Sequence, residues 1–484
     1  MTEQTNIQVQ KIDEYRWKIA KEGNMRVDGI IYADERMMEE IKKDKSLDQV
    51  ANVAHLPGIV KYSLAMPDIH WGYGFPIGGV AAFNAEEGII SPGGVGYDIN
   101  CGVRLLRSRL FRNEVSDKMR KLVDALFYNI PSGVGSRRKD LKLDFQREKE
   151  VLLKGAAWAV SQGFGTEKDI EHIEEGGCIK GADPTVVSDR ALERGRAQLG
   201  TLGSGNHFVE VGYVSEIYDK EVALALGLEL DQITVVVHTG SRGLGYQICD
   251  DYIKVMLDAA REYGIELPDR QLCCAPLNSP QGRDYFAAMA CAANYAFTNR
   301  QLITHWVRQS FEETFQMDLR HLQLDLIYDV CHNIAKFETH VVNGQQKKLC
   351  VHRKGATRAF PPGHPDVPVA YRSIGQPVLI PGDMGRCSYV LVGTVGAYEQ
   401  TFGSSCHGAG RVMSRNQATK IARGRNIARE LEDAGIFVHA ASRATLVEEI
   451  PEAYKDVTEV VDIVHHAGIG KKVVQLRPLG VIKG

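Results

Sequence analysis

A carboxylate and a thiol stand three residues apart in the glycine-rich stretch GGVGYDINCGVRLL, residues 93–106. The two groups are Asp98 and Cys101, and an apolar run follows them directly. They gain little by packing on each other, but both are good ligands for a divalent metal once they are deprotonated. A free cysteine is most often a small buried hydrophobe. A carboxylate is rarely buried without a charged partner, so the presence of Asp98 favours a metal site.

Four histidines lie where an apolar run meets small or polar residues: His207 in GSGNHFVEV, His238 in VVVHTGSRGLG, His332 in DVCHNIAKFE and His407 in SSCHGAGR. Any one of them alone is typical of a buried histidine bonded to a backbone carbonyl, or of a loop residue. Four in matching contexts, beside Asp98 and Cys101, indicate a shared site. An aspartate, a cysteine and three histidines would suit a soft-to-borderline divalent ion. One thiolate bridging two ions would use five donors and leave open positions, and close metal pairs recur in phosphoryl chemistry.

Glycine clusters and basic runs point to an anionic ligand. GTLGSGN (200–206) and FGSSCHGAG (402–410) would let backbone N–H groups approach phosphate oxygens, although either could be a simple turn. Neither cluster is a Walker A loop. The sequence also lacks a GxGxxG motif that follows a strand and is itself followed by an acidic residue at the right distance. A nucleotide site would therefore be of an uncommon type. Arg353, Lys354 and Arg358, with the basic residues after His407, could form a track for a nucleic-acid backbone or only a solvated surface.

The length, net charge and composition of the chain limit the classes of protein to which it can belong. The 484 residues carry a net charge of −3, so nucleic-acid binding would need a local basic patch. Ten cysteines in so long a chain are not typical of a disulfide framework, and the polar N-terminus lacks the apolar core of a signal peptide. We therefore expect a cytoplasmic protein with free thiols. The apolar segment 285–297 is too short to span a membrane and predicts a buried helix.

Two helices that flank these motifs can be placed coarsely. Ser116 is expected to cap a helix whose buried face carries Met119, Leu122, Val123 and Leu126. Residues 414–435 predict one continuous helix, with Gly435 as its stop.

Two strands are expected to present histidines. Residues 233–238 (ITVVVH) predict a buried strand that ends at His238. In HLQLDLIYDVCHN, apolar residues alternate from Leu322 to Val330, and His332 continues their face if the strand runs so far. Helices and strands mix without a regular βαβ rhythm, which favours an α+β fold.

The motifs GGVGYDINCGVR, GSGNHFVEV, VVHTGSRGLG, YDVCHN, VHRKGATRAFPPG and SSCHGAGR, with the terminal KG, resemble the RtcB family of RNA ligases. The resemblance runs in order from about Pro67 to Gly484. It implies a single catalytic domain over residues 1–484, with the first sixty or so residues outside the matching motifs. The fold it implies is α+β, with mixed and antiparallel sheets surrounded by helices.

Members of this family join RNA 3′-phosphate or 2′,3′-cyclic phosphate ends to 5′-hydroxyl ends, in tRNA splicing or RNA repair, using GTP and manganese. The resemblance implies two Mn²⁺ per chain, with Cys101 bridging, and the ligands Asp98, Cys101, His207, His238 and His332. It implies that His407 attacks GTP and carries GMP as a phosphoramidate. RNA would be the substrate and GTP the co-substrate, an activating archease-type protein would be a partner, and no membrane would be involved.

The resemblance also implies a guanylate pocket made of Asn206, Phe208, Glu210, Asn333, Pro381, Gly382, Asp383, Met384, Ser388, His407, Gly408, Ala409, Gly410, Tyr454 and Lys483. Glu210 would accept hydrogen bonds from the guanine N1–H and amine, a pairing that adenine cannot offer. Asp383 stands where some members have a small hydroxyl residue. It would repel a triphosphate unless a metal or Arg386 compensates, or it could contact the ribose instead.

Four further residues receive weaker expectations. Arg353 and Arg411 are candidates for holding RNA phosphates, since the guanidinium fork suits bidentate contacts. Asp68 and His70, in MPDIHWG, match the family and are expected to shape the site.

Two other functions stay open on the sequence. A metal-dependent phosphodiesterase acting on RNA ends would need the five donors but not His407, Glu210 or Lys483. A non-catalytic metalloprotein would use a closed ion site only to hold loops together.

Overall fold

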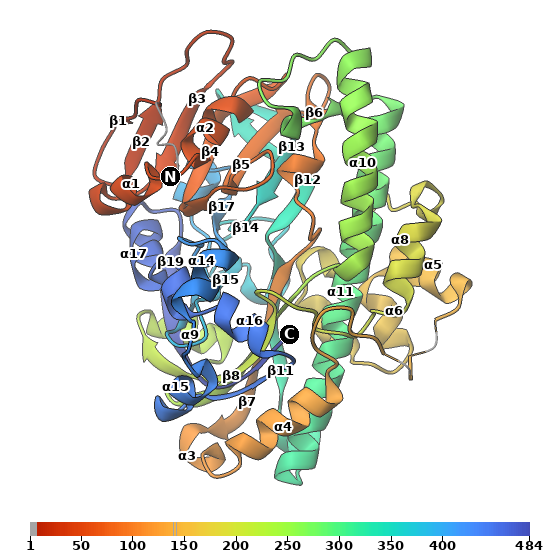
Figure 1. The fold of residues 1–484 in the computed structure, drawn as a ribbon, viewed down its shortest axis with the longest axis vertical. Helices are drawn as coiled ribbons and strands as arrows, with labels where there is room; N and C mark the ends of the chain where they lie inside the picture. The colour runs from red at the N-terminus through yellow and green to blue at the C-terminus, as the bar shows by residue number, and fades with distance from the viewer. Residues whose placement is uncertain (1–6, 139, 142) are drawn as a thin grey trace.

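Two large β-sheets with helices around them form an α+β architecture, as expected from the sequence (Figure 1). The computed structural model describes residues 7–138, 140–141 and 143–484. All ten cysteines lie in these residues, and none of them forms a disulfide.

The first sheet has seven strands within the described residues, in the order β1 (Gln10–Lys11), β2 (Arg16–Ile19), β3 (Asp28–Tyr32), β4 (Ile59–His70), β5 (Ile77–Asn84), β13 (Gln345–Lys354) and β12 (Asn333–Val342). Strand β3 pairs in parallel with β4, while β4 and β5 pair antiparallel. Strands β1, β2 and β3 thereby belong to the same sheet as β4, which carries Asp68 and His70.

The second sheet runs in the order β11 (Asp325–Cys331), β7 (Gly102–Phe111), β9 (Gln232–Thr239), β8 (Phe208–Ile217), β19 (Lys471–Lys483), β16 (Ser388–Val392) and β15 (Pro377–Ile380), with β18 (Phe437–Ala440) parallel to β19. Two short antiparallel pairs complete the strands of the described residues: β6 (Ile89–Ile90) with β10 (Ala275–Pro276), and β14 (Ala356–Arg358) with β17 (Ser404–Cys406).

Four neighbouring strands of the second sheet meet at one edge. Gly102, at the start of β7, pairs with Cys331 on one side and with Thr239 on the other. Phe208, at the start of β8, pairs with His238. Because these pairings are antiparallel, the beginnings of β7 and β8 lie beside the ends of β9 and β11. Segments far apart in the sequence are brought together at this edge.

Helix α11 (Pro280–Phe315) is 36 residues long and buried through most of its length. It begins at Ser279, whose side chain accepts a hydrogen bond from the Gly282 N–H, and it ends at Gln316 in a left-handed conformation. The predicted buried helix at 285–297 lies within its N-terminal half. Among the residues that the structure describes, no helix combines the length and apolar character needed to cross a membrane.

Helix α10 (Arg242–Glu262) packs along α11 (Figure 1). The other α-helices of the described chain are α1 (Glu35–Ile41), α2 (Ser46–Val53), α3 (Arg112–Val115), α4 (Met119–Asn129), α5 (Phe145–Lys154), α6 (Ala156–Ser161), α7 (Glu167–Glu171), α8 (Asp189–Arg196), α9 (Lys220–Leu226), α12 (Leu319–Leu322), α13 (Val395–Gln400), α14 (Arg415–Ile421), α15 (Ile427–Asp433), α16 (Arg443–Glu448) and α17 (Val457–His466).

Both predicted helix spans need correction at their ends or within them. Ser116 does not cap α4; it follows α3, and its hydroxyl donates to the Arg112 carbonyl, while α4 begins at Met119. The four apolar residues of α4 are buried as predicted. The span 414–435 is two helices, because Gly424 takes a φ of +85° between them and the Asn426 side chain caps the second.

Of the two predicted strands, one is confirmed and the other is shorter than predicted. Residues 233–238 lie within the fully buried β9, which confirms that prediction. Strand β11 begins only at Asp325, since Leu322 belongs to α12. A register shift between Leu326 and Tyr328 breaks the alternation, so these two side chains pack into different clusters of the core. His332 follows the strand directly instead of continuing it.

Candidate active site

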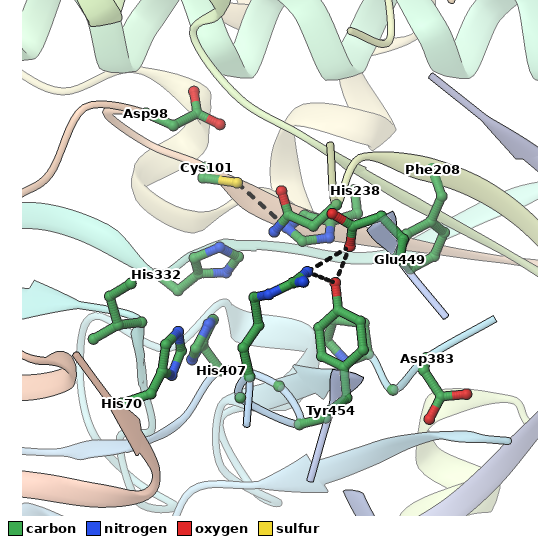
Figure 2. Close-up of a pocket in the computed structure, with 18 of the residues that line it drawn as sticks. His70, Asp98, Cys101, Phe208, His238, His332, Asp383, His407, Glu449 and Tyr454 are labelled. Atoms are coloured by element: carbon green, nitrogen blue, oxygen red, sulfur yellow. Dashed lines mark hydrogen bonds and ion pairs between the residues drawn. The ribbon is translucent and has the colours of Figure 1, made fainter. Parts of the chain in front are cut away.

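A cavity of about 400 Å³ opens at the edge where β7, β8, β9 and β11 meet. Figure 2 shows His238, His332, His407 and Cys101 around it, with Asp98 and Asp383 at opposite ends of the view. The residues that line it are His70, Tyr73, Ile77, Gly96, Tyr97, Asp98, Cys101, Asn206, Phe208, Glu210, His238, His332, Asn333, Lys354, Pro381, Gly382, Asp383, Met384, His407, Gly408, Ala409, Gly410, Arg411, Arg415, Glu449, Tyr454, Val481 and Lys483.

The five predicted metal donors converge beside this cavity. Cys101 Sγ lies 3.3 Å from His238 Nε2 and 3.6 Å from His207 Nε2. His207 Nε2 lies 2.8 Å from Asp98 Oδ2. The donors form two groups, each with its ligand atoms within 4.8 Å of one another: Cys101 with His238 and His332, and Asp98 with Cys101 and His207. Cys101 is common to both groups, so one sulfur could serve two ions.

Burial prepares the histidines to act as ligands. It lowers the pKa of His238 and of His332 well below the usual value, so both rings are neutral, which is the form that binds metals. Burial also raises the pKa of Cys101, and the Asp98 charge raises it further. Burial would raise the pKa of Asp98, but the hydrogen bond from His207 lowers it by more, to about 2.

His407 stands next to the donors but belongs to neither group. Its ring centroid lies 4.9 Å from that of His332. Its Nδ1 donates to Asp68 Oδ2 at 2.6 Å, and the same oxygen accepts the backbone N–H groups of His407 and Gly408. Because a carboxylate only accepts, Nδ1 carries the proton and Nε2 keeps its lone pair. Asp68 thus does more than shape the site: it holds the His407 ring and its tautomer.

A carboxyl group and an ammonium group lie on the β8–β19 side of the cavity. Lys483 pairs with Phe208 across the two strands, and its Nζ lies 5.4 Å from the Phe208 ring centroid. Burial, strengthened by the charge of Asp383, raises the pKa of Glu210 to about 8, and its Oε1 is buried without a hydrogen-bond partner. Burial lowers the pKa of Lys483 to about 8. This end of the cavity therefore presents the Glu210 carboxyl oxygen as a hydrogen-bond acceptor and the Lys483 ammonium as a donor.

Asp383 has partners of its own. Its Oδ2 lies 3.4 Å from Arg386 Nε, and its Oδ1 accepts the Gly385 N–H. Burial still raises its pKa. A metal or Arg386 was expected to offset the negative charge of Asp383. Of these two, the contact with Arg386 is present in the structure.

An ionic cluster lies between the donors and Asp383 in Figure 2. Arg411 Nη1 donates to the Tyr454 hydroxyl at 3.1 Å and lies 3.2 Å from Glu449 Oε2, and the Tyr454 hydroxyl donates to Glu449. Arg415 Nε lies 3.5 Å from the other oxygen of Glu449. Arg415 belongs to the basic run after His407 that could form a phosphate track, and it lines the cavity. Glu449 also lines the cavity but was not singled out from the sequence, since it stands in no glycine-rich motif.

Most members of the predicted guanylate pocket line this cavity, and the exception is Ser388. Its hydroxyl lies behind the loop 381–384, where it accepts the Gly382 N–H at 3.2 Å. Asn333 lines the cavity and ties two loops together, since its amide donates to the Asp98 carbonyl and accepts the Gly355 N–H.

The basic run 353–358 does not form the predicted surface. Arg353 is 1 % exposed, and its guanidinium is used by Glu338, the Ser404 hydroxyl and the Phe402 carbonyl. The prediction that Arg353 holds RNA phosphates is therefore wrong. Arg358 is equally buried and is paired with Glu174 and Glu175. Only Lys354 reaches the cavity, with its ammonium bonded to backbone carbonyls.

Comparison with known proteins identifies relatives over almost the whole chain. The family model described as "tRNA-splicing ligase RtcB" matches residues 49–484. Three proteins of that name are similar: that of Thermococcus kodakarensis is 56% identical over 99% of both chains, and those of Archaeoglobus fulgidus and Methanococcus maripaludis are each 55% identical over 98% of this chain and 99% of their own. A family model covering most of the chain and relatives of this similarity leave one assignment: the chain belongs to the RtcB family.

Proposed function

We propose that this protein is an RNA ligase that joins RNA 3′-phosphate or 2′,3′-cyclic phosphate ends to 5′-hydroxyl ends in tRNA splicing or RNA repair. The reaction would proceed through GMP bound to His407 and an RNA-3′-pp-5′-G intermediate. The observation that carries the proposal is that His407, with its Nε2 unbonded within the described residues, lines a cavity beside which five possible metal donors converge. Family membership supports RNA as the substrate. An activating archease-type partner is proposed on the resemblance of the sequence motifs alone.

The donor set fits metal ions. Three imidazoles, a thiol and a carboxylate form two groups of three that share the Cys101 thiol, and the lowered pKa values of His238 and His332 keep those rings neutral. Two Mn²⁺ would be held by Asp98, Cys101, His207, His238 and His332, with Cys101 shared. When bound, such ions neutralise phosphate charge and orient the reacting oxygens.

The other end of the cavity suits a guanine base. The Watson–Crick edge of guanine presents the N1–H and amine donors beside the O6 acceptor. Glu210, when ionised, could accept from the two donors, and Lys483 could donate to O6. Adenine presents an acceptor at N1 and a donor at its amine, so it would meet this pair with the wrong polarity.

The chain's residues account for the first step. His407 Nε2 attacks the α-phosphorus of GTP, a nitrogen–phosphorus bond forms, and pyrophosphate leaves. Asp68 keeps the Nδ1 proton in place and stabilises the positive charge that develops on the ring. Asp383, Met384, Ala409 and Gly410 line the cavity, where their backbone N–H groups could bind phosphates, whereas the N–H groups of Gly382 and Gly408 are already bonded to Ser388 and Asp68.

Two transfers complete the cycle. An oxygen of the RNA 3′-phosphate attacks the GMP phosphorus, which releases His407 and leaves the RNA-3′-pp-5′-G end. The 5′-hydroxyl of the second RNA then attacks the terminal RNA phosphorus, a phosphodiester forms, and GMP leaves. Arg411 and Arg415, at the side of the cavity, could hold RNA phosphates.

A joining assay tests the proposal. Two RNA strands, one ending in a 3′-phosphate and the other beginning with a 5′-hydroxyl, are incubated with the protein, Mn²⁺ and either GTP or ATP. We expect a joined product with GTP, little with ATP, and none with His407→Ala. With an RNA that ends in a 2′,3′-cyclic phosphate, opening of that ring to a phosphomonoester without joining, at a rate that does not depend on nucleotide, would instead identify a phosphodiesterase. A folded protein that binds metal but changes neither RNA end would identify a non-catalytic metalloprotein.

A further inference from the structure

The centre of helix α11 carries polar side chains in the deepest part of the molecule. Asn299, Arg300, Gln301 and Thr304 are all 0% exposed, although the helix is surrounded by apolar core. Burying such groups costs free energy unless each finds partners. The partners of Asn299 and Arg300 are the loops that carry the proposed metal donors.

Arg300 contacts three of these segments at once. Its Nη1 donates to the Asn100 carbonyl at 2.8 Å and to the Thr239 carbonyl at 3.0 Å. Asn100 directly precedes Cys101, and Thr239 directly follows His238. Its Nε and Nη2 bind Asp329 at 2.9 to 3.1 Å, and Asp329 lies on β11, three residues before His332.

The loop before Cys101 is shaped to accept this contact. Asn100 takes a φ of +52°, and its side chain both accepts from Arg300 Nη2 and donates to the Ala293 carbonyl on the same helix. The residue after Cys101 is Gly102, and a Cβ there would lie 3.0 Å from the guanidinium carbon of Arg300. A larger side chain would thus push the arginine away from the loop.

Asn299 extends the contact to the remaining donor loop. Its amide donates to the carbonyls of Thr201 and Gly240, and its oxygen accepts the Gly200 N–H. The segment 200–202 in turn holds His207, whose Nδ1 is bonded to the Leu202 carbonyl at 3.1 Å.

We propose that Arg300, assisted by Asn299, is a positioning residue for the metal centre, fixing the spacing between the loops that present Cys101, His238 and His332. The proposal rests on the proposed function, since it assumes that these donors bind metal. Groups that orient ligands from behind commonly change metal affinity by 10- to 100-fold. Lysine cannot replace the arginine, because one ammonium group cannot span two carbonyls and a carboxylate in the plane of a guanidinium fork.

Arg104 provides a matched control. It is also 0% exposed, and its Nε binds Asp329 at 2.7 Å, but its other bonds go to Gln301 and Thr304. It contacts neither the Asn100 carbonyl nor the Thr239 carbonyl. Arg300→Lys and Arg104→Lys therefore disturb the same buried ion cluster, and only the first releases the donor loops.

The experiment measures Co²⁺ binding to the full chain through the thiolate-to-cobalt absorption band, with urea unfolding of the metal-free proteins alongside. Both variants should lose stability. We expect Arg300→Lys to bind Co²⁺ about 10- to 100-fold more weakly and Arg104→Lys to stay within about threefold of the wild type. Equal affinity in Arg300→Lys and the wild type, or equal weakening in both variants, would overturn the inference.

A second variant covers the case in which Arg300→Lys fails to fold. Asn100→Gly keeps the left-handed backbone and removes only the side-chain bonds to Arg300 and Ala293. It should also weaken Co²⁺ binding, and an unchanged affinity would count against the inference. If the wild-type protein gave no thiolate band at all, the proposed metal centre itself would fail, which is a separate result.

Discussion

The two nitrogens of the His407 ring have different surroundings. Nδ1 is bonded to the buried carboxylate of Asp68, while Nε2 forms no hydrogen bond within the described residues and lies in the wall of the cavity. Burial would raise the pKa of Asp68, but the positive charge that the His407 ring carries when protonated, together with the hydrogen bonds that His407 donates, holds it below the usual value. Asp68 is therefore ionised when it orients the ring.

Replacing Asp68 by asparagine tests this arrangement. The amide oxygen can still accept the backbone N–H groups of His407 and Gly408, but the substitution removes the negative charge that holds the Nδ1 proton and stabilises the ring as it becomes positive. We expect formation of GMP-histidine to slow by about 10²- to 10⁴-fold, by analogy with triad aspartates, with GTP affinity within about threefold of the wild type. Single-turnover labelling with GTP measures the first quantity and nucleotide titration the second. A rate near that of the wild type would show that Asp68 does not orient the nucleophile.

The pair Glu210 and Lys483 predicts how guanylate binding depends on pH. Burial holds the pKa of each at about 8, so below that pH Glu210 is protonated and above it Lys483 loses its charge. The proposed contacts with guanine need the ionised forms of both. Affinity for GMP in the metal-free protein should therefore peak near pH 8 and fall about tenfold per pH unit on either side. Titration calorimetry from about pH 6 to pH 10 measures this profile. Glu210→Gln should remove the acidic limb, and a profile that is flat in the wild type would contradict the assignment.

At the scale of elements, four antiparallel strands bring the donors together. Cys101 precedes β7, His207 precedes β8, His238 lies near the end of β9 and His332 follows β11. The pairing of Gly102 with both Cys331 and Thr239 sets these ends side by side. A shift of this register would separate the donors without altering any of them.

Gly102→Ala tests how closely the strands must approach. A Cβ at this position would lie 2.7 Å from the Val330 carbonyl as well as close to Arg300. We expect the substitution to lower the free energy of unfolding by about 1–3 kcal/mol, as overpacking of a core does. Urea unfolding of the metal-free protein measures the loss. Stability equal to that of the wild type would mean that β7 and β11 can separate freely here.

Elements with a strong local pattern could be predicted from the sequence. The run ITVVVH gave the buried strand that carries His238, and the segment 285–297 gave part of a buried helix. The prediction of one helix over 414–435 was wrong, because Gly424 at φ +85° and the Asn426 cap divide a pattern that is typical of one continuous helix. The break in β11 was missed because a register shift leaves no mark on an alternating sequence.

The site could be predicted in its residues but not in its arrangement. Residue types and motif contexts singled out the donors and His407, and the family resemblance divided their roles. Neither indicated that Asp68 on the first sheet would meet His407 after β17. Arg353 was misjudged because its neighbours in sequence say nothing about Glu338, which faces it from the adjacent strand.

At the scale of the whole molecule, the cavity joins parts of both sheets. Asp68 and His70 come from the first sheet, the donors from one edge of the second, and Lys483 from the last strand. A metal that binds only the assembled site should therefore stabilise the whole fold.

Metal addition to the chelator-treated protein tests that coupling. With Mn²⁺ at about 100 times its dissociation constant, the free energy of unfolding should rise by about 2.7 kcal/mol. His238→Ala should lose most of this increase, because it removes a donor from the group that includes Cys101. Thermal unfolding with and without Mn²⁺ measures the effect. An increase of equal size in the variant would place the bound ion elsewhere.

The most direct test of the account asks where GMP becomes attached. The protein is incubated with Mn²⁺ and GTP labelled at the α-phosphate, denatured and examined for covalent label, with mass spectrometry to locate it. We predict an acid-labile GMP on His407 that is absent in His407→Ala and present in His207→Ala only at a reduced level. Label that persists in His407→Ala, or wild-type protein that takes up none, would contradict the claim that this cavity activates nucleotide at that histidine.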